Sequence, residues 1–320
     1  MNYQDKITIG IRDSQLSKAQ TKEFILLAEK SIEGVNKNSF NIKFIKTSGD
    51  IHDTKRLDKI GGKGLFIKEI EERILLNEID MGVHSMKDMP AISHNNLEIF
   101  CYMDRLDNSD VLISNSGKTL SNLDRGSIIG TSSVRRRAQI LNFRKDLNIK
   151  LLRGNVDTRV TKLRNNNYDA IILAYAGLKR LNMESQITEI LSHEDFLPAA
   201  GQGAIGIQSK VNNRFKKSFE KINDKQTEIT IAAERSFLKT IKANCNSPVS
   251  AYATIENRKL NLQCQILTHS GELIFDECMS GEINDGQNIG QELGNIAIQN
   301  LGQNTIDKLD NLENDFNYTP

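Results

Sequence analysis

The sequence predicts an α/β protein with two similar domains around a cleft and a small α+β C-terminal domain. Three observations carry this prediction. Apolar strands alternate with amphipathic helices as far as Leu173, which is typical of a largely parallel sheet. Short motifs recur in the same order in two successive stretches of the chain. After Pro248 the pattern changes to alternating strands joined by hairpin turns.

The elements of the first stretch follow from hydrophobic periodicity. Ser14 is a natural N-cap, since its hydroxyl precedes an apolar pattern of helical spacing. Gly61, Gly62 and Gly64 lack the spacing of a phosphate-binding loop, so we interpret their segment as a mobile loop over a site. The expected elements are strands at 7–11, 42–45 and 79–83, a helix from Leu16 through Leu27, and a helix over 67–74.

The second stretch repeats this plan. Residues 9–14 resemble 129–133, since each segment has a strand, a glycine and a hydroxyl-capped helix, and 80–85 resembles 169–174. Two such domains that face each other place strand C-termini and helix N-termini around a shared cleft. The expected elements are strands at 111–113, 128–129, 151–152 and 170–173 and helices at 138–147 and 156–163.

The remainder of the chain is expected to return to the first domain and then form a third. The segment 197–207 holds too many glycines for a helix, so we interpret it as a hinge crossing followed by a strand. A helix from Thr227, strands that turn at 256–257 and 270–271, and a helix over 287–309 follow. The predicted domains are 1–103 with 204–222, 104–203, and 223–310, followed by a frayed polar tail at 311–320.

Composition limits the classes of function. Lys plus Arg number 42 and Asp plus Glu number 41, so the formal net charge of +1 does not suit a bulk nucleic-acid binder. The four cysteines are scattered without a CxxC pair, which indicates neither a disulfide framework nor a metal site. The N-terminus lacks an apolar signal region and no apolar run reaches membrane-spanning length, so we expect a cytoplasmic protein without a membrane partner.

The segment from Gly130 to Arg137 carries the strongest local signal. Hydroxyl side chains and the backbone N–H groups of a helix N-terminus form an anion site there. Arginines in the first helical turn are unfavourable for the helix dipole, so these cations need another partner, and a bound polyanion is the simplest one. A solvated basic face is the alternative, and the recurrence of arginine at Arg153 and Arg159 favours the bound anion.

Lys87-Asp88 follows a strand directly, at the predicted edge of the cleft. In that place Asp88 is suited to acid catalysis or to stabilising a developing cation, with a surface ion pair as the alternative. His84 is more typical of a hydrogen-bonded structural residue than of a catalytic base.

The cysteines differ in their sequence context. Cys245 lies on a polar loop, and a loop thiol near a basic cleft is suited to act as a nucleophile. Cys264 and Cys278 lie within strand patterns, so we expect both in the core. Cys245 is therefore the candidate for covalent chemistry.

Taken together, these motifs resemble those of the hydroxymethylbilane synthase family, also called porphobilinogen deaminases. The similarity runs from Ile7 to about Pro248, and more loosely to the C-terminus. It implies two domains of the periplasmic-binding-protein type, with the chain crossing back near Gly201, and a monomer. The motifs are Gly61-Gly62-Lys63-Gly64-Leu65-Phe66, Val83-His84-Ser85-Met86-Lys87-Asp88, Gly130-Thr131-Ser132-Ser133-Val134-Arg135-Arg136, Leu152-Arg153-Gly154-Asn155-Val156, Ala176-Gly177-Leu178-Lys179-Arg180-Leu181 and Leu197-Pro198-Ala199-Ala200-Gly201-Gln202-Gly203.

The resemblance also implies a transferase of tetrapyrrole biosynthesis, the route to porphyrin and haem. Its dipyrromethane cofactor, itself made from the small-molecule substrate porphobilinogen, is attached to Cys245 by a thioether. Four porphobilinogen molecules are added head to tail with loss of ammonia, and hydrolysis releases hydroxymethylbilane. Pyrrole acetates and propionates make the growing chain a polycarboxylate, which suits many arginines. Loss of ammonia leaves a cationic azafulvene, which the carboxylate of Asp88 is placed to stabilise.

Residue roles are implied by position in these motifs. The implied catalytic residues are Asp88, Arg12, Arg153 and Arg159. The implied cofactor-binding residues are Cys245, Ser85, Lys87, Asp88, Thr131, Ser132, Ser133, Arg135, Arg136 and Arg159. The implied substrate-binding residues are Arg12, Ser14, Arg153, Arg180 and Gln202.

Departures from the family pattern bear on three places. Ala243-Asn244 stands where family members often have Gly-Gly, which leaves the geometry around Cys245 open. Arg137 occupies a variable position, so we expect it to face solvent. Asp157 adds a negative charge between two predicted site arginines, and we expect it to pair with an arginine.

The alternative function is a non-catalytic two-domain hinge protein that binds a small polycarboxylate. It accounts for twin α/β domains and a basic cleft. It does not account for Lys87-Asp88 together with a loop cysteine in a third domain. A nucleic-acid partner is weaker still, because aromatic residues do not interleave with the arginines.

Overall fold

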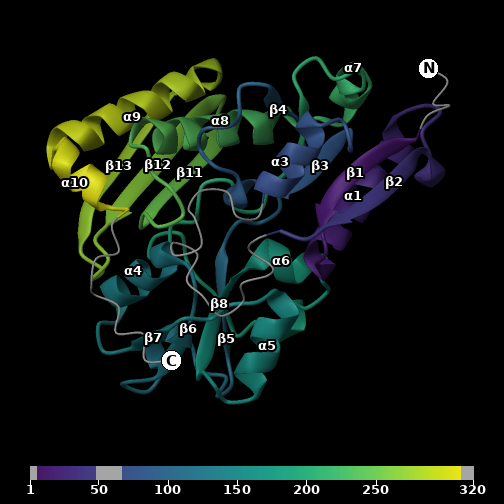
Figure 1. Ribbon diagram of the computed structural model, residues 1–320. Coiled ribbons are helices and arrows are strands. Elements are labelled where there is room, and N and C mark those ends of the chain that lie inside the picture. Colours follow the sequence, from purple (N-terminus) through teal and green to yellow (C-terminus); the bar gives the residue numbers. More distant parts are fainter. Residues whose placement is uncertain (1–5, 48–66, 311–320) are drawn as a thin grey trace. The chain divides into compact units, whose positions relative to one another are not determined.

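The structure is a computed structural model that describes residues 6–47 and 67–310 (Figure 1). The chain divides into two compact units, Met1–Leu106 with Gly203–Glu228 and Asp107–Gln202 with Ile229–Pro320. The three-domain division, with its boundaries, stays a prediction. The glycine motif at 61–66, interpreted as a mobile loop, and the tail at 311–320 lie outside the described residues.

The described part of the first unit contains one five-stranded sheet, in the order β2-β1-β3-β10-β4. The strands β2, β1 and β3 are parallel, and β10 is antiparallel to both of its neighbours. Of these strands, β4 was not predicted. The strands are β1 (Ile7–Arg12), β2 (Phe40–Ile45), β3 (Met81–Ser85), β4 (Leu97–Tyr102) and β10 (Ile205–Lys210).

Helices cover this sheet and close its core. Ser14 caps α1 as predicted, since its Oγ accepts a hydrogen bond from Ser17 N at 3.1 Å. Phe24 of α1 stacks on Phe219 with ring centroids 5.5 Å apart, within an apolar cluster that also holds the β1 isoleucines. The helical elements are α1 (Gln15–Ser31), η1 (Lys37–Ser39), α3 (Lys68–Leu75), η3 (Met86–Asp88), α7 (Lys216–Phe219) and η6 (Glu220–Ile222).

The second unit contains, within its described residues, another five-stranded sheet in the order β7-β6-β8-β5-β9. Neighbouring residues along β8 face opposite sides: Ile172 packs with Ile140 of α4, whereas Ile171 packs with Leu163 of α5. The elements are β5 (Asp110–Ser114), η4 (Leu120–Asn122), β6 (Ile128–Gly130), α4 (Val134–Phe143), β7 (Asn148–Lys150), α5 (Val156–Arg164), β8 (Ala170–Ala174), α6 (Tyr175–Arg180), η5 (Glu184–Gln186) and β9 (Glu189–Ile190).

Two predicted bounds in this sheet were wrong. The strand expected at 151–152 is β7 at Asn148–Lys150, because its register with β6 pairs Ile129 with Ile149. The helix expected to reach Leu147 ends at Phe143, and Arg144 instead donates to Ser121 O and to Asp146 Oδ1, each at 2.7 Å.

The two sheets are built alike, as the repeated motifs predicted. Gly10 pairs with Gly82 across β1 and β3, and Gly130 pairs with Ile171 across β6 and β8. Asp80 Oδ2 accepts a hydrogen bond from Thr8 N at 2.7 Å, and Asp169 Oδ2 accepts one from Ile128 N at the same distance. In each sheet the strand beside the third parallel strand runs antiparallel. The predicted likeness of the two α/β sheets is confirmed.

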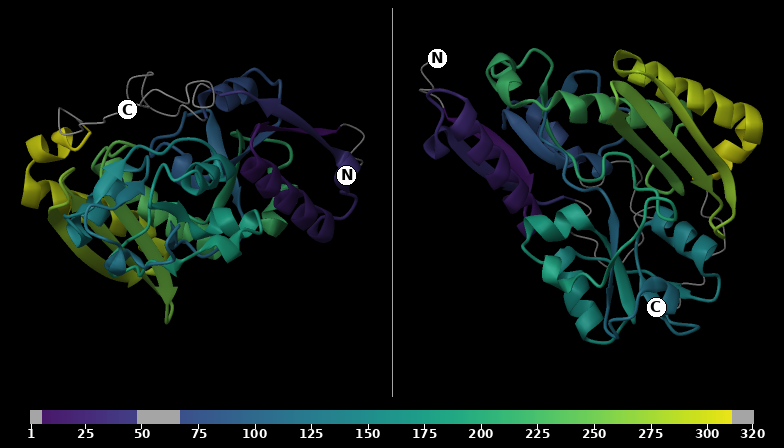
Figure 2. Two further views of the ribbon diagram at one scale, coloured as in Figure 1. Left: turned by 90° about the horizontal axis from the view of Figure 1, so that it is seen from below. Right: turned by 180° about the vertical axis from the view of Figure 1, so that it is seen from behind.

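A smaller α+β arrangement completes the chain. Its three-stranded antiparallel sheet, counted within the described residues, has the order β11-β12-β13, and α9 lies along one face of it (Figures 1 and 2). The helix expected over 287–309 is broken at Gly302, whose φ of 78° is left-handed and cannot continue a helix. The elements are α8 (Lys225–Thr240), β11 (Val249–Glu256), β12 (Lys259–Leu267), β13 (Leu273–Glu282), η7 (Ile283–Asp285), α9 (Gly286–Leu301) and α10 (Gln303–Lys308).

Within residues 6–47 and 67–310, no helix combines the length and apolar character needed to cross a bilayer.

Candidate active site

The start of α4 has the predicted form of a hydroxyl-lined helix N-terminus. Ser133 is the N-cap, and its Oγ accepts a hydrogen bond from Arg136 N at 3.4 Å. Thr131 is buried, and its Oγ1 accepts from Ser133 N at 3.2 Å. These bonds order the backbone N–H groups at the head of the helix.

The two arginines in the first turn of α4 share the carboxylate of Asp110. Arg135 Nη1 lies 2.7 Å from Asp110 Oδ2, and Arg136 Nη2 lies 2.7 Å from Asp110 Oδ1. All three side chains are buried, at 6% exposed or less. Burial alone would raise the pKa of Asp110, but the two guanidinium groups outweigh it and hold that pKa well below its usual range. The cations that the helix dipole disfavours are therefore stabilised by a carboxylate on β5.

Three amide and hydroxyl side chains complete this cluster. Gln202 Nε2 donates to Asp110 Oδ1 at 2.8 Å and to Asn108 O at 2.7 Å. Gln139 Oε1 accepts from Arg135 Nη1 at 2.8 Å, and Gln139 Nε2 donates to Ser250 Oγ on β11 at 3.2 Å. The predicted cofactor residues Arg135 and Arg136 thus meet the predicted substrate residue Gln202 at one carboxylate.

Sequence reasoning missed Asp110 itself. An acidic residue at the head of the buried run Val111-Leu112-Ile113 is a signal, because a charge at the start of a core strand needs a compensating partner. The sequence does not say which cation that partner is.

Arg135 and Arg136 differ in what the protein leaves for a ligand. Arg136 donates from Nε, Nη1 and Nη2 to Asp110, Ile172 O and Gln202. Arg135 donates only from Nη1, and its buried Nε has no hydrogen-bond partner among the described residues. The cluster of two guanidinium groups and one carboxylate also keeps an excess positive charge. Both features fit a carboxylate ligand such as those of a dipyrromethane.

The second arginine motif lies beside the first. β6 and β7 are parallel neighbours, and Leu152 N donates to Thr131 O at 3.3 Å. Arg159 Nη2 donates to Ser132 Oγ at 3.3 Å, while its Nε donates to Gly154 O at 2.7 Å. Arg153 is 7% exposed and lies between β7 and α5. The two arginine motifs therefore lie side by side in this unit.

The remaining arginine prediction in this unit concerns Arg180. It is the last residue of α6 and is half-buried. Cations at a helix C-terminus are favoured by the helix dipole, so the helix itself stabilises this guanidinium.

The first unit carries the other predicted site residues at one edge of its sheet. β1 and β3 are parallel neighbours, so Arg12 at the end of one and Ser85 at the end of the other lie at the same edge. Ser85 Oγ accepts from Gln20 Nε2 at 2.7 Å. Lys87 and Asp88 follow in the single turn η3 and are half-buried.

His84 is a buried residue of the β3 core, 5% exposed, on the strand beside β10. The hydrogen bond expected for it is not seen at Nε2, which has no partner among the described residues. Burial lowers the pKa of His84 from 6.5 to about 4, with the side chain of Gln208 opposing that shift. The imidazole is therefore neutral at pH 7.

The cysteines separate into buried and exposed pairs. Burial raises the pKa of Cys101 to about 12, and it raises that of Cys264 well above 9.0. Cys245 is exposed on the loop after α8. The expectation that Cys278 is a core residue was wrong, because it lies on the outer face of the edge strand β13 and is exposed.

Two further expectations were wrong. Arg137 is half-buried rather than solvent-facing, since its Nη1 donates to His269 O at 3.0 Å and joins α4 to the β12–β13 turn. Asp157 is exposed and makes no ion pair with any described residue. Its place in the first turn of α5 is favourable through the helix dipole alone.

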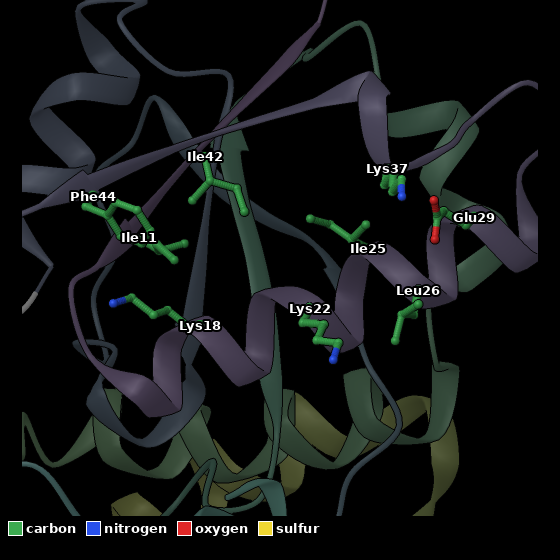
Figure 3. A pocket seen from close by; sticks show the side chains of 9 residues that line it. All are labelled: Ile11, Lys18, Lys22, Ile25, Leu26, Glu29, Lys37, Ile42 and Phe44. Carbon is green, nitrogen blue, oxygen red and sulfur yellow. The ribbon is translucent and has the colours of Figure 1, made fainter.

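A hollow of about 280 Å³ lies between α1 and β2 in the first unit (Figure 3). Apolar side chains including Ile25 and Ile42 form its floor, and Lys18, Lys22 and Lys37 stand around it. None of the predicted site residues lines it.

Two sequence models of one family match this chain. The model for "Porphobilinogen deaminase, dipyromethane cofactor binding domain" matches residues 7–217, and that for "Porphobilinogen deaminase, C-terminal domain" matches 228–299. A relative named porphobilinogen deaminase, from Geobacillus sp. (strain WCH70), is 43% identical over 307 residues, covering 95% of this chain and 97% of the relative. Another of that name, from Bacillus subtilis (strain 168), is 40% identical over 307 residues, covering 95% and 96%. The chain belongs to the porphobilinogen deaminase family.

Proposed function

We propose that this chain condenses four porphobilinogen molecules head to tail onto a dipyrromethane primer, releasing ammonia at each addition and finally hydroxymethylbilane. Family membership supports both the reaction and the cofactor. The structural observation that carries the proposal is the cluster around Asp110, where the buried Nε of Arg135 has no hydrogen-bond partner among the described residues. A buried donor of this kind on a cation costs free energy until a carboxylate accepts from it.

Cys245 carries the primer in this proposal. It is exposed on a loop, whereas burial keeps the thiols of Cys101 and Cys264 protonated and enclosed. The Cys245 sulfur bonds to the carbon from which ammonia departs, and the thiol proton leaves with that nitrogen. No oxidant is needed. Since the sulfur must stay reduced, and none of the four cysteines forms a disulfide within the described residues, we place the reaction in the cytoplasm.

The second unit supplies most of the proposed carboxylate-binding groups. Thr131, Ser132 and Ser133 present hydroxyls and helix N-terminal N–H groups to the primer, and Arg135 presents its unpartnered edge. The primer supplies the pyrrole to which each new pyrrole unit is added. The other proposed primer-binding residues in this unit are Arg136 and Arg159. The proposed substrate-binding residues in this unit are Arg153, Arg180 and Gln202.

The first unit supplies the proposed acid–base group. The Asp88 carboxylate stabilises the cation left when ammonia departs and assists proton transfer. Ser85 and Lys87 bind the primer, and Arg12 and Ser14 bind the incoming substrate. Arg12 and Ser85 are the last residues of the adjacent parallel strands β1 and β3, and Ser14, Lys87 and Asp88 follow within three residues.

Mass spectrometry of the intact protein tests the proposal. We expect an added mass of two pyrrole units on the parent chain but not on Cys245→Ser. Cys278→Ser is the control, because Cys278 is also exposed, and we expect this variant to carry the added mass. The loaded protein is also expected to release ammonia and form a bilane from porphobilinogen. A loaded protein that did neither would instead be a binding protein for polycarboxylates.

A further inference from the structure

The loop that carries Cys245 is held by its own side chains. Lys242 has a φ of 54°, which turns the chain out of α8. Asn244 N donates to Ser247 Oγ at 2.9 Å, and Ser247 N donates back to Asn244 O at 3.1 Å. Asn244 Oδ1 also accepts from Asn246 N at 2.8 Å. These bonds close a short turn with the exposed Cys245 inside it.

The carboxylate of Asp310, the last described residue, accepts hydrogen bonds from both ends of this turn. Asn244 Nδ2 donates to Asp310 Oδ2 at 2.5 Å, and Ser247 Oγ donates to Asp310 Oδ1. Asp310 lies 66 and 63 residues away from these partners in sequence. Hydrogen bonds to an ionised carboxylate are stronger than neutral ones, and each oxygen here accepts one.

Asp310 is itself fixed in place by the fold. The preceding residue, Leu309, is buried in the apolar core of the C-terminal sheet. His269 Nε2 donates to Leu309 O at 3.0 Å, and Arg137 Nη1 donates to His269 O at 3.0 Å. A continuous set of hydrogen bonds therefore links α4, the β12–β13 turn, the end of α10 and the Cys245 loop.

We infer that Asp310 is a positioning residue that holds the Cys245 loop in the shape in which the cofactor is attached. The inference rests on the proposed attachment of dipyrromethane at Cys245. This loop obtains its shape from the side-chain bonds of Asn244 and Ser247. Without Asp310, Asn244 and Ser247 lose their shared acceptor and the thiol loses its fixed direction.

The test compares Asp310→Ala with Asp307→Ala in apoprotein made by cells that cannot supply porphobilinogen. Asp307 is a matched control, because it lies on the exposed side of α10 and, within the described part of the chain, accepts a single hydrogen bond, from Gln303 Nε2 at 2.8 Å. Porphobilinogen is added, and the two-pyrrole adduct is followed by mass spectrometry. We expect Asp310→Ala to acquire the adduct on the order of tenfold more slowly than the parent chain, which corresponds to the loss of about one charged hydrogen bond. We expect Asp307→Ala to acquire it at the parent rate.

Alkylation by iodoacetamide separates positioning from general unfolding. Cys278 is a second exposed thiol in the same molecule, on β13 and away from the loop contacts. In Asp310→Ala we expect Cys278 to react at the parent rate and Cys245 to react no more slowly than in the parent, although loading is slow. An equal acceleration at both thiols would indicate general loosening and overturn the inference.

A double-mutant comparison gives a second readout. If Asn244 and Asp310 act through the hydrogen bond between them, the double variant Asn244→Ala/Asp310→Ala acquires the adduct no more slowly than Asp310→Ala alone. Asp310→Asn, which keeps one acceptor, is expected to fall between parent and alanine variant. Loading of Asp310→Ala at the parent rate would refute the positioning role, whereas a parent chain that never forms the adduct would refute the proposed function itself.

Discussion

Asp110 Oδ1 and Arg136 Nη2 lie 2.7 Å apart, with side chains 0% and 6% exposed. The carboxylate lies at the start of the core strand β5. The guanidinium lies in the first turn of α4, which follows β6, and β8 separates β6 from β5 in the sheet. Breaking such a buried pair leaves a charge that water cannot reach. The pair therefore makes a helix start rich in arginine compatible with the fold.

Replacing Asp110 by asparagine is expected to destabilise the protein strongly. The variant leaves Arg135 and Arg136 buried without their shared carboxylate, a change of about 3–5 kcal/mol in the free energy of unfolding. Urea unfolding measures it. The control is Asp124→Asn, which breaks the exposed pair with Lys118 and is expected to cost less than about 1 kcal/mol. Equal losses in the two variants would contradict our account of the cluster.

His84 predicts a pH dependence of stability. The pKa of His84 is about 4 in the folded protein, against the ordinary 6.5 of a solvated histidine, so the unfolded chain binds more protons between these values. Neutral His84 contributes about 3 kcal/mol to the free energy of unfolding. This contribution is complete above pH 6.5 and is lost as the pH falls through 4.

Urea unfolding of the parent chain and of His84→Gln between pH 4.5 and 7 measures this loss. That range lies above the usual pKa of aspartate, so the titration of Asp110 stays outside it. The parent is expected to lose stability as the pH falls, and the variant to respond less. Parallel curves would remove His84 as the cause.

Asp88 and Asp80 are expected to separate catalysis from folding. Asp88→Asn removes the proposed acid–base carboxylate and should lower kcat by about 100-fold or more, with stability changed by less than about 0.5 kcal/mol. Asp80→Ala removes the acceptor of Thr8 N and should lower stability by about 1 kcal/mol. Bilane formation and urea unfolding of both variants provide the comparison, and a large stability loss in Asp88→Asn would assign it to the fold.

Two adjacent serines are expected to respond differently. Ser133→Ala removes the N-cap of α4 and should lower stability by about 1 kcal/mol. Among the described residues, Ser132 Oγ accepts one hydrogen bond, from Arg159 Nη2 at 3.3 Å, so Ser132→Ala should leave stability nearly unchanged and raise the KM for porphobilinogen by about threefold to tenfold. Thermal unfolding and initial rates distinguish them. A KM that is unaffected by Ser132→Ala would exclude this hydroxyl from binding.

The sequence by itself determined the local elements, the repeated motifs of the two sheets and the exposed setting of Cys245. Periodicity, caps such as Ser14 and tight turns depend on residues within a few positions, so neighbours in sequence are enough to predict them. The equivalence of Asp80 and Asp169 was also visible, because the same short pattern forms the same backbone contact twice.

Only the tertiary structure decided which charges meet. Asp110 reaches Arg136 because β5 lies beside β8, and Asp310 reaches Asn244 because α10 packs on the C-terminal core. Such contacts join residues 26 and 66 positions apart, and their energy depends on burial that no short stretch of sequence contains. For the same reason, Arg137 and Cys278 were misplaced by local pattern: one is held by a distant carbonyl, and the other lies on an edge strand that only the sheet order defines.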